Sequence, residues 1–551
     1  MSQKDAQLLL KRVVAAIAVS SIIVYEIWRW YNFLLKPSTY AFSIPFVVCE
    51  SIFVVLGNIN LLFFAFQGEM KRDILRLRDK ERISFESYPT VDIMIPTYSE
   101  PTAIVRETLL AVINLNYTKH KMHVYVLDDG GSREKQQMVE QISIETINGV
   151  TVRYIGRKKT PGVPHHAKAG NINNALFNCD TNGELVVVFD CDMIAQQDFL
   201  QATVPHFYNS DGTRDENCAM VQTPQSFSNI STNDPLGQQY LTFYGPGLMG
   251  WDTAGSTPCC GTNVVFSRNA FNTLEPKGFQ YGSITEDFLT SLTMHASGLK
   301  SKYVREILAT GLAPETYSDF FKQRFRWAAG GLQIFFFKNP LLKYGLTKKQ
   351  KFLYFTAGLN NLLAIPMAVM MVIPSLFLIA QSTNPELTLG AFDSVEYAVV
   401  FMIMVFFNFL TSALVFGAAG YGPILRSIQE AGFIVPCFLS AISSIVFCRP
   451  LKFTATPKDK TAKMKQELGY IIPNILFYLL SITGLICGLV SIVKNQSFSL
   501  IVCMLWILFT MWQVYPPISE YFELCRKSRP EKDEKSDPII SFNIAPESIP
   551  A

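Results

Sequence analysis

The hydropathy of this 551-residue sequence changes abruptly twice, and these changes constrain its fold more than any other feature. Two apolar stretches open the sequence, a long region of ordinary globular character follows, and apolar stretches then return. A helix needs about 20 apolar residues to cross a hydrocarbon core of about 30 Å. Six stretches approach or exceed that length, two before and four after the globular region, and we expect each to span a membrane: Val13–Leu35, Ile44–Phe66, Gly358–Ala380, Tyr397–Gly417, Tyr470–Val493 and Phe498–Tyr515.

The first apolar stretch and a further, shorter one need separate interpretation. Glu26 and Arg29 lie inside the first stretch, and no small-residue cleavage site follows it, so we expect a retained span and not a signal peptide. The shorter stretch, Gly432–Cys448, contains Pro436 and lies between arginines. Its length and flanking charges predict an interfacial or re-entrant segment.

Basic residues gather on one side of the expected spans. Six Lys or Arg residues lie between positions 71 and 82, directly after the second span, and three more lie between 348 and 351, before the third. Residues 381–396, between the third and fourth spans, contain neither Lys nor Arg. By the positive-inside rule, the central region and both termini are expected to be cytosolic, and the chain is expected to be a multi-pass protein of the plasma (inner) membrane.

Composition agrees with this division and excludes one class of function. Charged residues make up only 17% of the sequence and hydrophobic residues 49%, a blend of membrane and globular material. The 48 basic and 45 acidic side chains nearly balance, which argues against a nucleic-acid partner. The eleven cysteines form no Cys-x-x-Cys pair, so we expect them to be reduced, as a cytosolic domain requires.

The central region, residues 85–340, alternates short β-branched runs with amphipathic stretches. The runs that predict strands are Val91–Ile95, His123–Leu127, Val152–Ile155, Glu184–Phe189 and Ala219–Val221. Helical spacing separates the first four runs, so the pattern predicts an α/β domain with a mostly parallel sheet, inserted between the transmembrane helices. Ligands of such sheets bind at the carboxyl ends of the strands.

Acidic side chains follow three of the predicted strands. Glu100 lies just after the first, Asp128 and Asp129 after the second, and Asp190 and Asp192 after the fourth. Carboxylates gathered at one sheet edge repel one another unless a cation or a ligand with donors offsets their charge. Hard oxygen ligands, completed by substrate phosphates, suit Mg²⁺ or Mn²⁺. Asp-Gly after a strand is also ordinary turn chemistry, so the prediction depends on the clusters occurring together.

Three further segments carry candidate site residues. Lys168 lies near the start of a predicted helix, where it can hold a phosphate or simply face solvent. Thr285-Glu286-Asp287 enters another helix, where the acidic residues are either catalytic or an ordinary capped first turn. Tyr317–Phe337 is aromatic and basic, and is either an interfacial anchor or a site in which Trp327 is a platform for a sugar and Arg326 faces a diphosphate.

These segments, in this order, resemble the motifs of processive, membrane-integrated family 2 glycosyltransferases, and most of all those of bacterial cellulose synthase catalytic subunits and related β-glucan synthases. The matching segments are Asp128-Asp129-Gly130, His166-Ala167-Lys168-Ala169-Gly170-Asn171, Asp190-Cys191-Asp192, Gln222-Thr223-Pro224, Cys260-Gly261-Thr262, Thr285-Glu286-Asp287, Gly311–Thr316 and Gln323-Arg324-Phe325-Arg326-Trp327. The resemblance covers about residues 85–340 and implies a GT-A-type fold for the cytosolic domain, with amphipathic interface helices beside it.

The resemblance also implies a role for individual residues. UDP-sugar binding falls to Tyr98, Glu100, Asp128, Asp129, Lys168, Asp190, Gln323 and Arg326, and the metal, Mg²⁺ or Mn²⁺, falls to Asp192 and Asp190. Catalysis falls to Asp287, with Thr285 and Glu286 beside it, and acceptor binding to Cys260, Gly261 and Trp327. An acceptor hydroxyl deprotonated by Asp287 attacks the anomeric carbon in line with the leaving UDP, so the reaction inverts the configuration with one base.

A segment after the interfacial stretch resembles the gating loop of cellulose synthases, an F-x-V-T-x-K pattern. Phe453, Thr456 and Lys458 match it and are expected to reach the nucleotide, while Ala455 stands where the pattern has Val. The alternative is a plain cytosolic loop. The charged tail that follows the last span predicts no PilZ-type cyclic di-GMP domain, which bacterial cellulose synthases usually carry there.

The resemblance therefore predicts a UDP-glucose-dependent β-glucan synthase that secretes its product through its own transmembrane channel. Its expected partners are UDP-glucose, the nascent β-glucan, the lipid bilayer and an accessory secretion subunit. Cellulose, a β-1,3-glucan and a mixed β-1,3/1,4-glucan all remain open as the product. The alternatives are a synthase that uses another UDP-sugar and, from a different class, a transporter or scaffold that only binds nucleotide.

The same reasoning divides the chain into six parts. These are an N-terminal two-helix membrane segment at 1–70, the glycosyltransferase domain at 85–340, transmembrane helices three and four with the interfacial helix at 341–448, the candidate gating loop at 449–468, transmembrane helices five and six at 469–516, and a cytosolic tail at 517–551.

Overall fold

The structure is a computed structural model of the full chain. It describes residues 3–36, 38–66, 88–145, 149–159, 162, 164–209, 211–231, 233–389, 395–418, 424–451, 464–495 and 498–527. The candidate gating-loop residues Phe453, Thr456 and Lys458 lie outside the described residues, as does most of the C-terminal tail.

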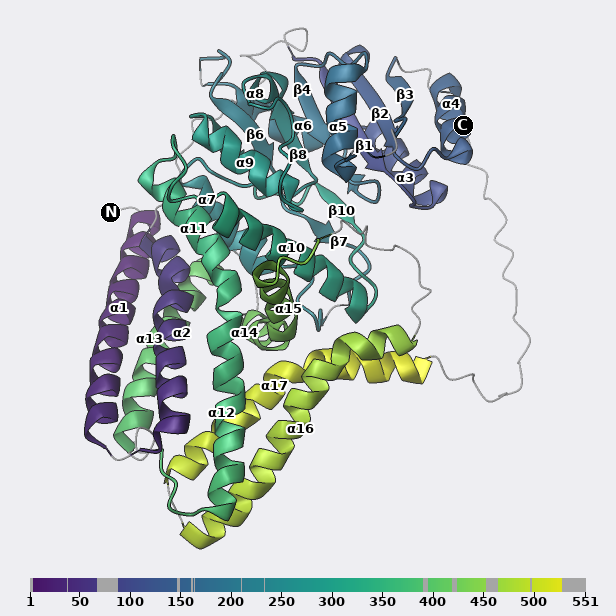
Figure 1. The fold of residues 1–551 in the computed structure, drawn as a ribbon. Coiled ribbons are helices and arrows are strands. Elements are labelled where there is room, and N and C mark those ends of the chain that lie inside the picture. The colour runs from purple at the N-terminus through teal and green to yellow at the C-terminus, as the bar shows by residue number, and fades with distance from the viewer. Residues whose placement is uncertain are drawn as a thin grey trace, which may run out of the picture.

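Long apolar helices precede and follow an α/β domain, as the hydropathy predicts (Figure 1). The described residues contain six helical stretches that are long and apolar enough to cross a membrane, two before the domain and four after it. They are built from α1 (Gln3–Leu35), α2 (Tyr40–Phe66), α11 (Lys348–Leu362) with α12 (Ala364–Thr383), α13 (Val395–Ala418), α16 (Met464–Asn495) and α17 (Phe498–Lys527). One of the six consists of two consecutive helices, α11 and α12.

The expected interfacial stretch, Gly432–Cys448, contains α15 (Val435–Val446), and α14 (Ile424–Phe433) precedes α15 and meets it at a 50° bend. Such a bend suits either a broken span or a segment that turns back at the membrane surface. In Figure 1, α15 lies beneath α10 (Tyr317–Phe337), between the α/β domain and the membrane helices, and the two helices are in extensive contact. The membrane-facing side of the domain therefore has its own layer of helices.

The α/β domain has a central sheet of seven strands in the order β3-β2-β1-β4-β8-β6-β9. The strands are β1 (Val91–Thr97), β2 (Met122–Asp128), β3 (Thr151–Gly156), β4 (Leu185–Val188), β6 (Cys218–Gln222), β8 (Val264–Ser267) and β9 (Lys300–Tyr303). All adjacent pairs are parallel except the two that β8 makes, with β4 and with β6. The prediction of a mostly parallel sheet is thus confirmed, whereas β8 and β9 were not predicted.

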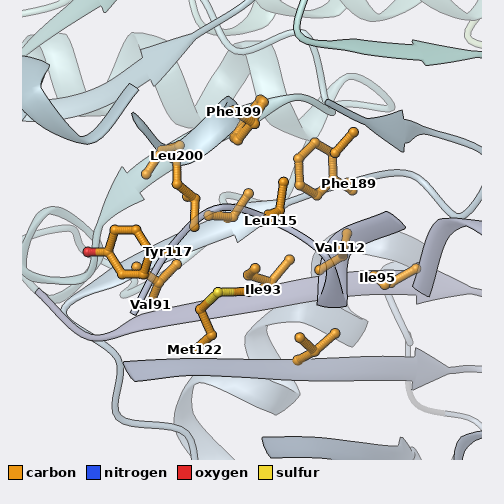
Figure 2. Packing of buried hydrophobic residues seen from close by; sticks show 14 of the residues in the cluster. Val91, Ile93, Ile95, Val112, Leu115, Tyr117, Met122, Phe189, Phe199 and Leu200 are labelled. Atoms are coloured by element: carbon orange, nitrogen blue, oxygen red, sulfur yellow. The ribbon is translucent and has the colours of Figure 1, made fainter. Parts of the chain in front are cut away.

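Alternation along β1 distributes side chains to the two faces of the sheet. Val91, Ile93 and Ile95 point to the same side, into the core that Figure 2 shows, while Met94 joins the core on the opposite face. Helices cover both faces: α3 (Thr102–Ile113), α4 (Arg133–Glu145) and α6 (Phe199–Thr203) cover the first, and α5 (Ala167–Asn178) and α8 (Arg268–Asn272) cover the second. Burial on both faces explains why these strands read as continuous apolar runs in the sequence.

The remaining elements are short or lie nearer the membrane. A second sheet pairs β5 (Ile194–Ala195), β10 (Ala309–Gly311) and β7 (Ser226–Phe227). Single turns occur at Lys119–Lys121, Val204–Phe207 and Phe243–Gly247, and α7 (Leu248–Asp252) and α9 (Glu286–Ala296) complete the domain.

This topology brings the predicted motifs to one edge of the sheet. The carboxyl ends of β1, β2 and β4 share that edge because the three strands are parallel. The segment that leads into β8 reaches the same edge from the other direction, because β8 runs antiparallel to β4. Cys260–Asn263 therefore lies opposite Asp190, although 70 residues separate them in the sequence.

Candidate active site

Lys168 lies at the centre of the site, where α5 begins. Its Nζ forms a short ion pair with Asp190 and donates to the Gly261 carbonyl oxygen at 2.7 Å. Burial alone would lower the pKa of Lys168, but the adjacent Asp190 carboxylate raises it overall. The lysine is consequently charged at neutral pH and fixed between the end of β4 and the segment before β8. Thr262 Oγ1 also accepts from the Asp190 N–H at 2.8 Å.

Gly261 is the point at which this cluster meets the candidate base. Its φ of +87° is a conformation that favours glycine, and a Cβ there would lie 2.9 Å from Asp287 Oδ2 and 3.8 Å from Lys168 Nζ. A side chain at this position would occupy the space in front of both functional groups. Gly261 thus allows Asp287, Lys168 and the backbone to converge around one small volume.

Asp287 and Glu286 lie in the first turn of α9, and the pKa of each carboxyl group is raised. Burial, followed by the Asp287 charge, raises the pKa of Glu286 to about 7. Burial also raises the pKa of Asp287, against the opposing effects of the Phe288 N–H, Lys168 and Arg326. A carboxylate with a raised pKa and nearby cations is the arrangement that a general base needs at neutral pH.

Thr285 is at the N-cap position of α9, but its side chain does not cap the helix. Its Oγ1 instead lies 3.0 Å from Ser283 Oγ, which donates to the Gly330 carbonyl oxygen of α10. A Cβ on Gly330 would lie 2.3 Å from Thr285 Oγ1, so the two elements meet at van der Waals distance. This contact sets α10 directly against the start of α9.

Asp128 and Asp129 occupy different environments. Asp128 is fully buried, and its carboxylate accepts from the N–H groups of Gly130 and Ser132 and from the Tyr154 hydroxyl. It organises the loop after β2. Asp129 instead forms a two-pronged ion pair with Arg157, at 2.8 and 2.6 Å. Arg157 is a site residue that the sequence reasoning missed, because nothing in the spacing links it to Asp129.

Tyr98 and Glu100 form the outer wall of the predicted nucleotide site. Glu100 accepts from the Thr97 hydroxyl at 2.8 Å and from the Tyr98 N–H at 2.6 Å, which fixes the turn after β1. The Tyr98 ring is 53% exposed and lies 4.8 Å from Lys159 Nζ. An exposed ring held on a rigid turn is suited to stack on a flat ligand.

Asp190 and Asp192 are the predicted metal ligands, and they face different neighbours. Asp192 is buried, and its Oδ2 accepts from the Leu312 N–H at 3.2 Å. Among the described residues, no group of three or more His, Cys, Asp or Glu side chains is arranged to hold a metal ion. Two carboxylates fit an ion that takes its remaining ligands from phosphate oxygens and water, as Mg²⁺ commonly does.

Gln222 fixes the segment that carries Cys260. Its Oε1 accepts from the Cys260 N–H at 2.9 Å, and its Nε2 donates to the carbonyl oxygens of Thr223 and Thr262 at 2.8 Å each. The fully buried side chain therefore ties the end of β6 to the start of β8. The sequence reasoning named the Gln222-Thr223-Pro224 motif without a role, and this hydrogen-bond network provides one.

On the membrane side, α10 carries Gln323, Arg326 and Trp327. The Trp327 ring lies 6.0 Å from the Tyr240 ring, and the guanidinium of Arg324 lies over both rings, at 4.6 and 4.1 Å. Burial lowers the pKa of Arg326, and the charges of Glu286, Asp287 and Asp190 partly offset this by raising it. Gln323, one turn before Trp327, is partly buried. The helix thus presents one arginine to the carboxylates and another to the aromatic pair.

Arg324 was not predicted as a site residue. Arg324 is only 3% exposed, and its Nη2 lies 3.4 Å from Glu430 Oε1 of α14. Its Nε and Nη1 are buried and have no hydrogen-bond partner within the part of the chain that the structure describes. A buried guanidinium with unused donors beside two aromatic rings is an environment suited to a polyhydroxyl ligand.

Comparison with known proteins finds two families that match parts of the chain. Residues 89–330 match the family described as glycosyltransferase-like family 2, and residues 275–420 match the cellulose synthase family. The UDP-forming cellulose synthase catalytic subunit of Komagataeibacter sucrofermentans is 30% identical over 416 residues, which are 74% of this chain and 52% of the relative. A corresponding subunit of Komagataeibacter xylinus is 31% identical over 421 residues, with the same two coverages.

A third relative, the UDP-forming cellulose synthase catalytic subunit of Xanthomonas axonopodis pv. citri, is 33% identical over 340 residues, 60% of this chain and 41% of the relative. This chain therefore spans about half the length of the curated relatives it matches. Over residues 89–420, the chain is therefore similar to family 2 glycosyltransferases and to cellulose synthases.

Proposed function

We propose that this protein is a processive, inverting β-glucan synthase that transfers glucose from UDP-glucose to a growing polysaccharide. The observation that carries the proposal is the convergence of Asp287, Lys168 and Asp190 around Gly261, at the sheet edge where family 2 motifs meet. The similarity to UDP-forming cellulose synthases over three quarters of the chain supports the choice of nucleotide and sugar.

In the proposed reaction, Asp287 removes the proton from the acceptor hydroxyl as that oxygen attacks the anomeric carbon. The bond between the anomeric carbon and the leaving UDP oxygen breaks on the opposite face, so one base is sufficient and the configuration inverts. The raised pKa of Asp287 favours proton uptake at this carboxylate. Lys168 and Arg326 stabilise the negative charge that develops on the diphosphate.

Asp190 and Asp192 would hold a Mg²⁺ or Mn²⁺ ion, which supplies further neutralisation of the leaving diphosphate when bound. In the structure, Lys168 pairs with Asp190, so part of the carboxylate charge is already offset by the chain itself. On the outer side, Tyr98 and Glu100 contact the base and ribose of the nucleotide, and Arg157 holds Asp129 in place for the same group.

The acceptor is proposed to lie against Cys260 and Trp327 and to leave toward the membrane. A sugar ring stacked on Trp327 lies beside Tyr240 and the unused donors of Arg324, which can bind its hydroxyls. Glu430 of α14 is the ion-pair partner of Arg324 on this side of the site. A polymer of hydroxyls needs such partners because each unpaired polar group in hydrocarbon costs several kcal/mol.

The topology proposed for this reaction places the α/β domain and both termini in the cytosol. Basic residues adjoin the domain side of the spans, which the positive-inside rule assigns to the cytosol. Polymer grown on the cytosolic face then passes between the spans that follow the domain. An accessory secretion subunit would receive it on the opposite side.

The test uses the full chain, purified and inserted into lipid vesicles with its α/β domain facing outward. UDP-glucose, UDP-N-acetylglucosamine, UDP-galactose and GDP-mannose are supplied one at a time, and nucleotide release is measured. We expect UDP release with UDP-glucose alone, and a polymer that resists added glucanase until the vesicles are dissolved with detergent. Digestion by β-1,4- and β-1,3-specific glucanases then identifies the linkage.

Absence of UDP release from UDP-glucose contradicts the proposal. Release with another donor would identify the alternative synthase, and nucleotide binding without release from any donor would identify the transporter or scaffold. Polymer that is digested without detergent would contradict secretion while leaving the transferase reaction intact.

A further inference from the structure

One side of α9 is joined along its length to the segment that carries the acceptor residues. Asp287, Ser291 and His295 are four residues apart and form a stripe on one face of the helix. Asp287 lies against Gly261, and Ser291 Oγ accepts from the Cys259 N–H at 2.7 Å. The third member, His295, is about 12 Å along the helix axis from Asp287.

His295 is fully committed to hydrogen bonds inside the protein. It is 1% exposed, its Nε2 lies 2.9 Å from Ser301 Oγ, and its Nδ1 lies 2.7 Å from the Tyr354 hydroxyl. Ser301 donates its own proton to the Thr257 carbonyl oxygen at 2.7 Å. Ser301 therefore accepts from the Nε2–H of His295, which leaves Nδ1 to accept from Tyr354.

This arrangement requires a neutral imidazole, and the surroundings provide one. Burial lowers the pKa of His295 to about 3, so the ring carries a single proton throughout the physiological range. Both hydrogen-bond partners of His295, Ser301 and Tyr354, carry hydroxyl groups, and Tyr354 belongs to an apolar and aromatic cluster with Trp251 and Leu292. The chain of hydrogen bonds from Tyr354 through His295 and Ser301 to the Thr257 carbonyl oxygen, here called the relay, therefore has one donor direction and does not change with pH.

Tyr354 connects this relay to the membrane. It belongs to α11, the helix that enters the third candidate span, and it is 1% exposed. Its ring packs edge-on against Trp251 at 4.8 Å and against Phe288, the residue after the candidate base, at 5.2 Å. Phe63 and Phe64, at the end of α2, pack against the same cluster, so a second span contacts it as well.

We propose that Tyr354 and His295 are positioning residues that set the register of α9 against the acceptor segment Thr257–Gly261, and so hold Asp287 in place from the membrane helices. The contact acts through hydrogen bonds spaced along α9 and not through the reacting atoms. The assignment of Asp287 as the base rests on the proposed function, whereas the mechanical coupling between α11 and α9 does not.

The test compares Tyr354→Phe with a matched control in the full chain in lipid nanodiscs. Tyr354→Phe removes one hydroxyl and leaves the ring packing. Tyr117→Phe removes a buried tyrosine hydroxyl that donates to the Pro89 carbonyl oxygen at 2.8 Å, far from α9 in the core of the α/β domain. Amide hydrogen exchange of residues 257–263 and 286–296 and turnover per UDP-binding site are measured for both variants.

We expect Tyr354→Phe to speed exchange in both segments several-fold and to lower turnover per UDP-binding site about tenfold, with donor KM within twofold of the wild-type value. Tyr117→Phe should change neither readout. The double variant Tyr354→Phe/His295→Leu separates positioning from stability. In Tyr354→Phe alone, the buried Nδ1 of His295 loses its hydrogen-bond donor, and the second substitution removes that unsatisfied acceptor. It should regain thermal stability and keep the low turnover.

Unchanged exchange in residues 286–296 of the Tyr354→Phe variant would overturn the proposal, whatever the enzyme does. Turnover restored together with stability in the double variant would also overturn it. If the wild-type protein releases no nucleotide from any sugar donor, the proposed function fails, and the exchange measurement still decides whether α11 positions α9.

Discussion

The two halves of the candidate site are held in place by different parts of the molecule. On the nucleotide side, Asp128, Asp129 and Asp190 bind partners that all belong to the α/β domain. On the acceptor side, α10 is fixed by helices outside that domain. Glu467 of α16 accepts from the Ser318 N–H at 2.9 Å, and Asn474 of the same helix donates to the Tyr317 hydroxyl at 2.9 Å.

This difference indicates how a nucleotide-sugar reaction can be coupled to a membrane. Asp128, Asp129 and Asp190 keep their geometry from contacts within the α/β domain, so nucleotide binding should tolerate disturbance of the spans. The acceptor half, with Asp287 and Trp327, takes its geometry from helices that the lipid surrounds. Changes in the membrane helices should therefore alter transfer more than they alter UDP affinity, and the predictions below test that separation.

The largest effect is expected from Asp287→Asn, which keeps the shape of the side chain and removes its basicity. Transfer should fall about a thousandfold, within the usual range for loss of a general base, while the Kd for UDP changes less than threefold. UDP release and UDP binding by calorimetry measure the two quantities. Asp180→Asn, at a carboxylate whose side chain is 87% exposed, is the matched control and should leave both unchanged.

A result in which Asp287→Asn weakens UDP binding as much as transfer would contradict the division of the site. Equal activity in Asp287→Asn and in the wild-type protein would remove Asp287 from the mechanism altogether.

The next effect lies on the nucleotide side, at Lys168. Replacing it with Met removes the cation that pairs with Asp190 and bonds to Gly261. Hydrogen bonds to charged groups contribute about 1.5–3 kcal/mol each, so the Kd for UDP should rise by about 10- to 100-fold, and transfer should fall at least as much. Lys158→Met, at an exposed neighbouring lysine, is the control. Transfer lost without weaker UDP binding would place Lys168 on the acceptor side instead.

The sequence predicted the nucleotide half better than the acceptor half, and topology explains why. Asp128 and Asp190 follow parallel strands, and parallel strands end at one edge, so a local pattern was enough to bring them together. Cys260–Asn263 reaches that edge only because β8 is antiparallel to β4. The hydropathy pattern of the four residues of β8 cannot indicate the direction in which the strand runs. The family resemblance, and not the pattern, supplied Cys260 and Gly261.

Residues missed by the sequence reasoning are those whose partners are far away in the chain. Arg157 pairs with Asp129 across two strands, and Arg324 meets Glu430 across 106 residues. Neither arginine stands out among its basic neighbours until the packing is known. The bounds of α10 and the start of α9 were predicted, yet the hydrogen bonds of these helices to α16 and α11 depend on tertiary contacts alone.

A smaller effect should follow from Glu467→Gln, which tests the acceptor half from the membrane side. The Glu467 side chain is buried, and its charge stabilises the N-terminal end of α10 through the Ser318 N–H and hydroxyl. Without that charge, transfer should fall about threefold to tenfold, and UDP binding should not change. Glu140→Gln, on the exposed surface of α4, is the control. Weaker UDP binding in Glu467→Gln would show that the two halves are not separate.

The smallest effect is a displacement of the pH profile, and its sign follows from the charges around the base. Asp287 must be deprotonated to act, and burial raises its pKa, so transfer should decline as the pH falls through the raised pKa of the Glu286–Asp287 pair, which for Glu286 is about 7. Arg326 opposes that rise because its positive charge favours the carboxylate. Arg326→Gln should therefore move the acidic limb of the profile to higher pH, by less than about one unit, in addition to lowering the maximal rate.

Rates of UDP release at saturating donor, measured from pH 5.5 to 9 for the wild-type protein and for Arg326→Gln, check this shift, and Arg153→Gln at an exposed arginine of β3 is the control. A limb that stays in place, or moves to lower pH, would mean that Arg326 does not face the catalytic carboxylates and acts on the diphosphate alone.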